Sequence, residues 1–73
     1  MNNVRRKKLE KIKEEIERLT SEIEEVLEEE DEARENMNEC SEMYETSENA
    51  SENMQSAIDT LDEALEYLLY AVE

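Results

Sequence analysis

Apolar residues recur at alternating spacings of three and four over residues 9–72, which is nearly the whole chain. The repeat keeps a single register, with Leu9 at the first apolar position of a heptad and Ile12 at the second. A sustained heptad indicates helices that pack along a coiled-coil-like seam, so we expect an all-α fold. The residues expected to form this seam, including contacts between copies of the chain, are Leu9, Ile12, Ile16, Leu19, Ile58, Leu61, Leu65 and Leu68.

The seam is least regular in residues 41–53, which are rich in Ser, Thr and Asn. These side chains compete with the helix for backbone hydrogen bonds. Three seam positions are polar, and two of them, Ser47 and Ser51, lie in this stretch, while the third is Glu30. A break between two helices is therefore expected here.

Asn49 and Glu52 have the spacing of a capping box, which predicts that a second helix starts near Ala50. We therefore predict one domain over residues 1–73, a helical hairpin with helices at about 3–40 and 50–73 and a turn at about 41–49. The unbroken register and the absence of Gly and Pro leave a single long coiled-coil helix as the alternative.

The expected second helix has a wide apolar stripe, because alanines recur every seven residues beside its seam, at Ala50, Ala57, Ala64 and Ala71. A wide stripe predicts burial against more than one neighbour. The shorter second helix would also leave the N-terminal half of the first one bare. Both points predict a homodimer with a four-helix arrangement.

Charge is divided sharply along the chain. Residues 1–13 carry a net charge of +5 and residues 14–73 carry −20, which together give −15. The acidic part is either a solvated surface or a binding surface for a basic protein, and dense carboxylates on a helix can imitate the phosphates of nucleic acid. The candidate acidic face consists of Glu24, Glu25, Glu28, Glu29, Asp31, Glu32 and Glu35.

The basic N-terminus either contacts nucleic acid or pairs with the acidic end of a neighbouring subunit. We favour pairing, because the acidic body repels phosphates and no aromatic residues are interleaved with the cations. The cations concerned are Arg5, Arg6, Lys7 and Lys8.

Features that support catalysis are missing from the sequence. The chain has no histidine and no glycine, hence no imidazole base and no phosphate-binding loop, and we expect no enzyme activity, metal or cofactor. Cys40, on the seam, is expected to be a buried small hydrophobe. Tyr67 and Tyr70 are either exposed aromatic anchors for a partner or are buried by the wide stripe.

Two segments carry a resemblance to a known group of proteins. The sequence AIDTLDEALEYL at residues 57–68 resembles the second helix of small acidic helical-hairpin proteins from phages, prophages and mobile elements of Gram-positive bacteria, and RRKKLEKI at residues 5–12 resembles their basic helix start. That group has no settled function. The resemblance implies a mobile-element setting and a bacterial host cytoplasm.

The leading hypothesis is a small binding protein that docks on a basic host protein and inhibits a defence or nucleic-acid enzyme by imitating nucleic acid. One alternative is a self-assembling scaffold whose charge serves only solubility. A second is a DNA-associated accessory that uses the basic N-terminus. No apolar run is long enough for a membrane span, so no membrane partner is expected.

Overall fold

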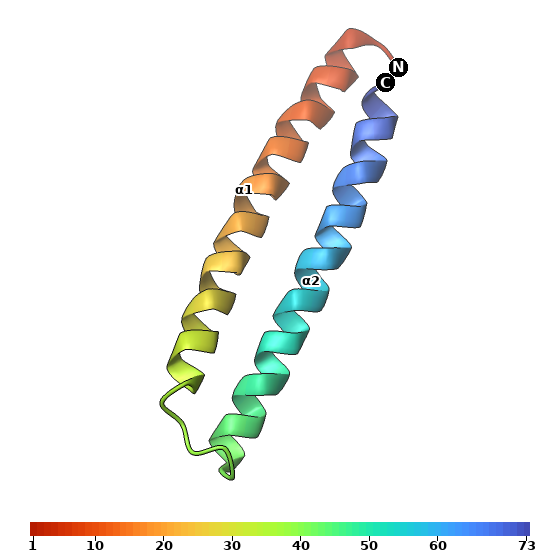
Figure 1. Cartoon of the computed structure of the whole chain (residues 1–73). Coiled ribbons are helices and arrows are strands. Elements are labelled where there is room, and N and C mark those ends of the chain that lie inside the picture. Colours follow the sequence, from red (N-terminus) through yellow and green to blue (C-terminus); the bar gives the residue numbers. More distant parts are fainter.

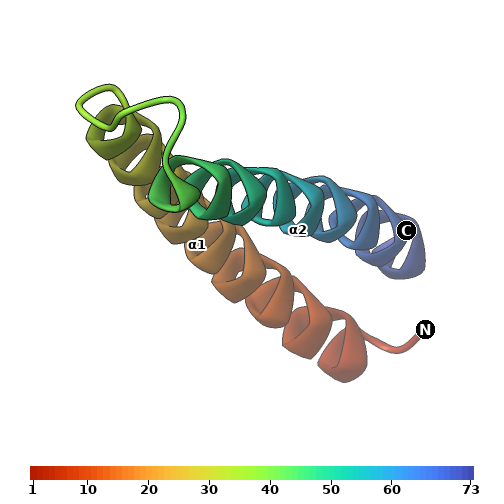
Figure 2. The ribbon, with the colours of Figure 1, turned by 90° about the horizontal axis from the view of Figure 1, so that it is seen from below.

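The computed structural model describes residues 1–73 as two antiparallel helices, α1 (Asn3–Arg34) and α2 (Glu42–Val72), joined by residues 35–41 (Figure 1). The helices run side by side for their full lengths, and the two chain ends lie together (Figure 1). Seen from below, α1 and α2 overlap near the turn and separate toward the chain ends, so the helices are inclined to each other (Figure 2). The predicted all-α hairpin is confirmed, and a single long helix is excluded.

The hairpin is a rod and not a globule. It measures 56 × 15 × 11 Å, and its radius of gyration is 16.8 Å, whereas a compact domain of this length would have about 11 Å. A rod of two helices has only one internal face, so little of the chain can be buried. Ile58 is the one buried apolar residue, at 4% exposed.

The predicted helix boundaries were wrong by six to eight residues. The first helix ends at Arg34 and not near residue 40, and the second begins at Glu42 and not near residue 50. Asn49 and Glu52 lie inside α2. The expected partial overlap of the helices is therefore also wrong, because α2 is long enough to reach the first turn of α1, where the Arg6 Nε donates to the Val72 carbonyl at 2.7 Å.

Local hydrogen bonds explain why the turn lies at 35–41. At the end of α1 the backbone tightens, and the amide of Met37 donates to the Arg34 carbonyl three residues back. Asn38 accepts from the Cys40 amide at 2.9 Å, which makes an Asx turn. The Ser41 hydroxyl then accepts from the Tyr44 amide at 3.1 Å and caps α2.

Replacing Ser41 with alanine is expected to destabilise the hairpin by about 1 kcal/mol, because the first turn of α2 loses its side-chain acceptor. Urea unfolding followed by circular dichroism measures the change. Ser56→Ala, in the middle of α2, is the control and should not destabilise the chain. Equal results for the two variants would contradict the assignment of Ser41 as the cap.

α1 turns two neighbouring rows of residues toward α2, both with heptad spacing, and all of these residues are at least partly buried. Leucine, isoleucine, a threonine and the stems of long polar side chains make up the contact. The first row is Leu9, Ile16, Ile23 and Glu30, and the second is Arg6, Lys13, Thr20, Leu27 and Arg34.

This contact corrects the predicted seam of α1 within one chain, while the predicted contacts between copies stay a prediction. The second row replaces the predicted Ile12 and Leu19, which are 46% and 47% exposed, and Val26, seven residues after Leu19, is 52% exposed. Hydrogen bonds at both ends of the second row fix this rotation of α1, because Arg6 bonds to Val72 and Arg34 to Ser51. On α2 the seam register is as predicted, and Leu61, Leu65 and Leu68 are partly buried beside Ile58.

Candidate protein-binding surface

The predicted acidic face lies on α1 and the start of the turn. Its glutamates are exposed, while Asp31 is partly buried. Glu24, Glu28 and Glu35 follow a spacing of four and seven residues and therefore lie on one side of the helix, on the flank opposite the row that contains Leu19 and Val26. Glu25, Glu29 and Glu32 continue round the back of α1.

α2 extends this acidic side. Ser51 donates to Asp31 at 2.7 Å, so this flank of α2 lies beside the acidic flank of α1. The carboxylates of α2 on the same flank are exposed and follow helical spacing. They are Glu48, Asp59, Asp62 and Glu66.

The density of negative charge approaches that of nucleic acid. Residues 24–35 hold eight acids and one arginine, a net charge of −7 over about 16 Å of helix, or roughly one charge per 2.4 Å. Double-stranded DNA carries about one charge per 1.7 Å. The acids of α2 add further charge alongside, so the face as a whole offers a rigid, closely spaced set of anionic oxygens.

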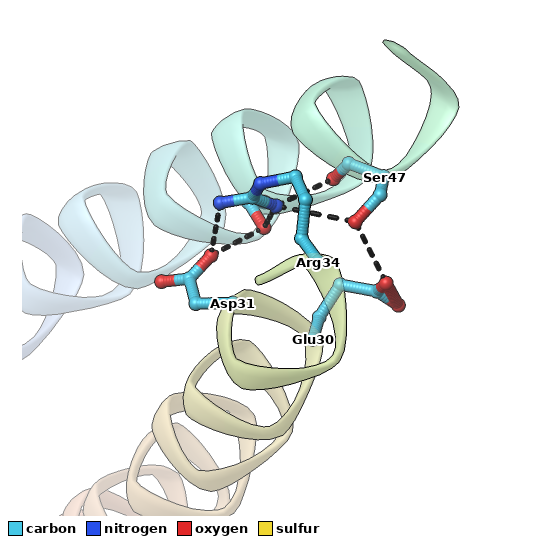
Figure 3. Close-up of polar contacts among 5 residues, drawn as sticks. Glu30, Asp31, Arg34 and Ser47 are labelled. Atoms are coloured by element: carbon cyan, nitrogen blue, oxygen red, sulfur yellow. Dashed lines mark hydrogen bonds and ion pairs between the residues drawn. The ribbon is translucent and has the colours of Figure 1, made fainter. Parts of the chain in front are cut away.

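A polar cluster joins the two helices near the turn end of this face (Figure 3). Arg34 Nη1 donates to Ser51 Oγ at 2.8 Å and to Ser47 Oγ at 3.2 Å, and Nη2 donates to Asp31 Oδ1 at 2.7 Å. The hydroxyls in turn donate to carboxylates, Ser51 to Asp31 at 2.7 Å and Ser47 to Glu30 at 2.8 Å. Each hydroxyl therefore links a cation to an anion across the helix interface.

The cluster shifts two ionisation equilibria. The Ser51 hydrogen bond, followed by the hydrogen bond and charge of Arg34, lowers the pKa of Asp31 below its ordinary value of 3.8. The hydrogen bond that Arg34 donates to Asp31 raises the pKa of Arg34, and the charge of Glu48 contributes to that shift. Both groups are therefore held in their charged forms.

The cluster revises the sequence-based interpretation of the polar seam positions, of Asp31 and of Arg34. The polar seam positions Ser47 and Ser51 predicted a helix break, but both lie within α2, where Ser47 donates to Glu30 and Ser51 donates to Asp31 across the interface. Asp31, predicted as part of the acidic face, is committed to this structural cluster. Arg34 was not predicted as an important residue, although it is the only cation in residues 19–73, and that isolation was the available signal.

The basic N-terminus is only partly free. Arg6 is partly buried, and by bonding the Val72 carbonyl it places a cation at the C-terminal end of α2, where the helix dipole favours one. Arg5, Lys7 and Lys8 are exposed. One of the four predicted basic contacts is thus used within the chain.

Tyr67 and Tyr70 are both exposed, at 74% and 62%, so the stripe of α2 does not bury them. Three residues apart, they diverge around α2: Tyr67 lies beside the alanine row, and Tyr70 lies on the back of the helix. They do not form one joint anchor.

Cys40 was predicted to be buried, but it is exposed in the turn, because α1 ends before reaching it.

No group of three or more Asp, Glu or Cys side chains is arranged to hold a metal ion. Neither helix is long and apolar enough to cross a membrane.

Comparisons of the chain with protein-family models, with curated proteins and with solved structures found no match.

Proposed function

We propose that this chain is an acidic binding protein that docks its carboxylate face on a basic protein surface, of the kind with which nucleic-acid enzymes hold phosphates. The observation that carries the proposal is the charge of this face, which approaches the density of DNA and is carried mostly by exposed side chains on two packed helices. Arg34, the cation nearest to it, is occupied by the polar cluster and leaves that charge accessible.

Occupying such a cleft would exclude nucleic acid from it, so we infer an inhibitor of a nucleic-acid enzyme. The resemblance to mobile-element proteins makes a host defence or replication enzyme the natural target. Fixed carboxylates suit this role, because a partner with a complementary potential is attracted at long range and the hairpin loses little conformational freedom on binding.

Capture from nuclease-treated bacterial lysate, followed by competition, tests the proposal. The expected result is a nucleic-acid-binding protein that elutes with salt and that duplex DNA displaces from the immobilised chain. Glu24→Lys with Glu28→Lys is expected to weaken its binding at least about tenfold, because like charges across an interface are strongly unfavourable. Asp31 is left unchanged because it belongs to the polar cluster.

Glu45→Lys with Glu63→Lys is the matched control. It changes the net charge equally but lies on the back of α2, away from the acidic face. The control should bind like the parent chain. If both double variants weakened binding equally, net charge alone would explain the effect. If Glu24→Lys with Glu28→Lys left binding unchanged, the acidic face would be rejected as the contact.

The exposed apolar row of α1 favours a second candidate function, a self-assembling scaffold. A scaffold associates through apolar area and therefore resists salt, whereas docking through carboxylates weakens steeply with salt. Recovery of the chain alone, with no salt-sensitive partner, would favour the scaffold.

The DNA-accessory alternative predicts instead that neutralising Arg5, Lys7 and Lys8 abolishes binding to DNA.

A further inference from the structure

One side of the hairpin carries an open, mostly apolar groove. Its volume is about 620 Å³, and it is lined by Leu19, Ile23 and Val26 of α1, by Met54 and Ala57 of α2, and by the polar Glu22 and Asn53. The groove lies on the flank opposite the acidic face. The question is which molecule covers it.

Both helices continue this apolar surface along the rod. On α1, Ile12 lies seven residues before Leu19, and Ala33 lies seven after Val26. On α2, a second stripe with 3-4 spacing contains no charged residue, although 42% of the chain is charged. This stripe is Thr46, Ala50, Asn53, Ala57, Thr60, Ala64, Tyr67 and Ala71. Its small residues allow a neighbouring helix to approach closely.

The exposed area matches that of half a complex. The hairpin exposes 5745 Å², whereas a folded monomer of this mass exposes about 4,700 Å². The excess of about 1,000 Å² is similar to the roughly 800 Å² that each partner buries in a standard interface. A partner the length of the hairpin would therefore bring the exposed area to that of an ordinary folded protein.

The exposed apolar row of α1 and the uncharged stripe of α2 can each pair with the same row of a second, antiparallel copy. In an antiparallel pair of α1 helices centred on Leu19, each Leu19 meets its copy and Ile12 meets Val26. In an antiparallel pair of α2 helices centred beside Thr60, Ala57 meets Ala64 and Ala50 meets Ala71. Both pairings need the chain's own residues and nothing else.

A single twofold axis satisfies both pairings. The bonds of Arg6 to Val72 and of Arg34 to Ser47 set the register of the hairpin. Both helices rise by about 1.5 Å per residue, so the point midway between the two bonded pairs is the same height on each helix. That point is Thr20 on α1 and about residue 60 on α2. Leu19 and Thr60, the centres of the two rows, therefore lie at one height along the rod.

Charge selects the same orientation. With the turns at opposite ends, Lys8 of one copy lies level with residue 30 of the other, so the basic chain ends lie beside acidic turn ends. With the turns at the same end, both acidic turn regions would gather together. Opposite charges placed level across antiparallel helices favour the first arrangement.

We propose that a second copy of this chain covers the groove, with Leu19 on the twofold axis and the turns at opposite ends, to form a four-helix bundle. α1 packs against α1 of the other copy and α2 against α2. The acidic faces point away from the interface, so the proposal does not depend on the proposed function. It differs from the sequence-based reason for a dimer, because α2 already covers the N-terminal half of α1.

Light scattering over a range of protein concentrations gives the first test. The expected mass is twice the chain mass of 8.6 kDa. Leu19→Glu is expected to raise the dimer dissociation constant at least about 100-fold, since apolar burial is lost twice per dimer. Leu69→Glu is the matched control, because Leu69 is similarly exposed, at 44%, but lies on the other flank, with Asp62 and Glu66. The Leu69→Glu variant should remain a dimer.

Crosslinking tests the orientation without relying on a disruptive variant. With Cys40→Ser to remove the native thiol, Leu19→Cys should give a disulfide-linked dimer when copper–phenanthroline is the oxidant, and Ile12→Cys alone should not. A monomeric parent chain, or a groove filled by a different protein, would overturn the proposal. A dimer whose Leu19→Cys variant fails to crosslink would overturn the twofold axis at Leu19.

Discussion

Ile58→Ala is expected to destabilise the hairpin by about 2–4 kcal/mol, the largest loss from any single truncation to alanine in this chain. Ile58 is 4% exposed and is the only buried apolar residue. It lies in the middle of α2, where both helices cover it. A small domain of this length has a total stability of about 4–11 kcal/mol, so this loss would be a large fraction of the whole.

Urea unfolding followed by circular dichroism measures this loss at a fixed protein concentration, because association would also change the apparent stability. Leu69→Ala is the control, since Leu69 is 44% exposed and has less burial to lose. Its cost should be below about 1 kcal/mol. If the two variants lose similar stability, Ile58 does not have the central packing role that its burial indicates.

Ser51→Ala is expected to cost about 1–2 kcal/mol at neutral pH, in spite of the better helix propensity of alanine. The Ser51 hydroxyl accepts from Arg34 at 2.8 Å and donates to Asp31 at 2.7 Å. Without it, two charged groups at the helix interface each lose a hydrogen bond. Urea unfolding measures the loss, with Ser56→Ala as the control for propensity because that serine is exposed.

The pH dependence of this loss identifies Asp31 as the group involved. A lowered pKa stabilises the folded state at pH values above the ordinary 3.8, and that stabilisation disappears as the pH falls through the lower folded value. Ser51 is the largest cause of the shift. The difference between Ser51→Ala and the parent chain should therefore shrink below pH 3.8, and a difference that stayed constant would contradict the assignment.

Much of the fold could be predicted from periodicity and composition. The heptad over residues 9–72 is a local property of the chain, and it predicted an all-helical fold and the seam of α2, while the stretch rich in Ser, Thr and Asn at residues 41–53 predicted the hairpin. The helix boundaries could not be placed in this way. Capping residues are common in the sequence, and Ser41 and Asn49 both fit a helix start, so local pattern alone did not distinguish them.

The candidate surface was also predicted only in part from the sequence. The acidic residues and their helical flank follow from the sequence, because exposed charge on a helix has the period of the helix. The separate role of Asp31 does not, since it depends on which residues of α2 lie opposite. The exposure of Tyr67 and Tyr70, left open by the sequence, likewise depends on the direction from which α1 approaches.

The sequence by itself determined that the chain forms amphipathic helices with one acidic body and one basic end, because those properties depend only on residues close together in the chain. Only the tertiary structure decided which side of α1 faces α2. An apolar row that contains Leu19 and a mostly polar row that contains Thr20 were both available to it, and hydrogen bonds of Arg6 and Arg34 with residues of α2 favour the row that contains Thr20 and leave Leu19 exposed. Those bonds join residues up to 66 positions apart, and no local pattern carries such a pairing.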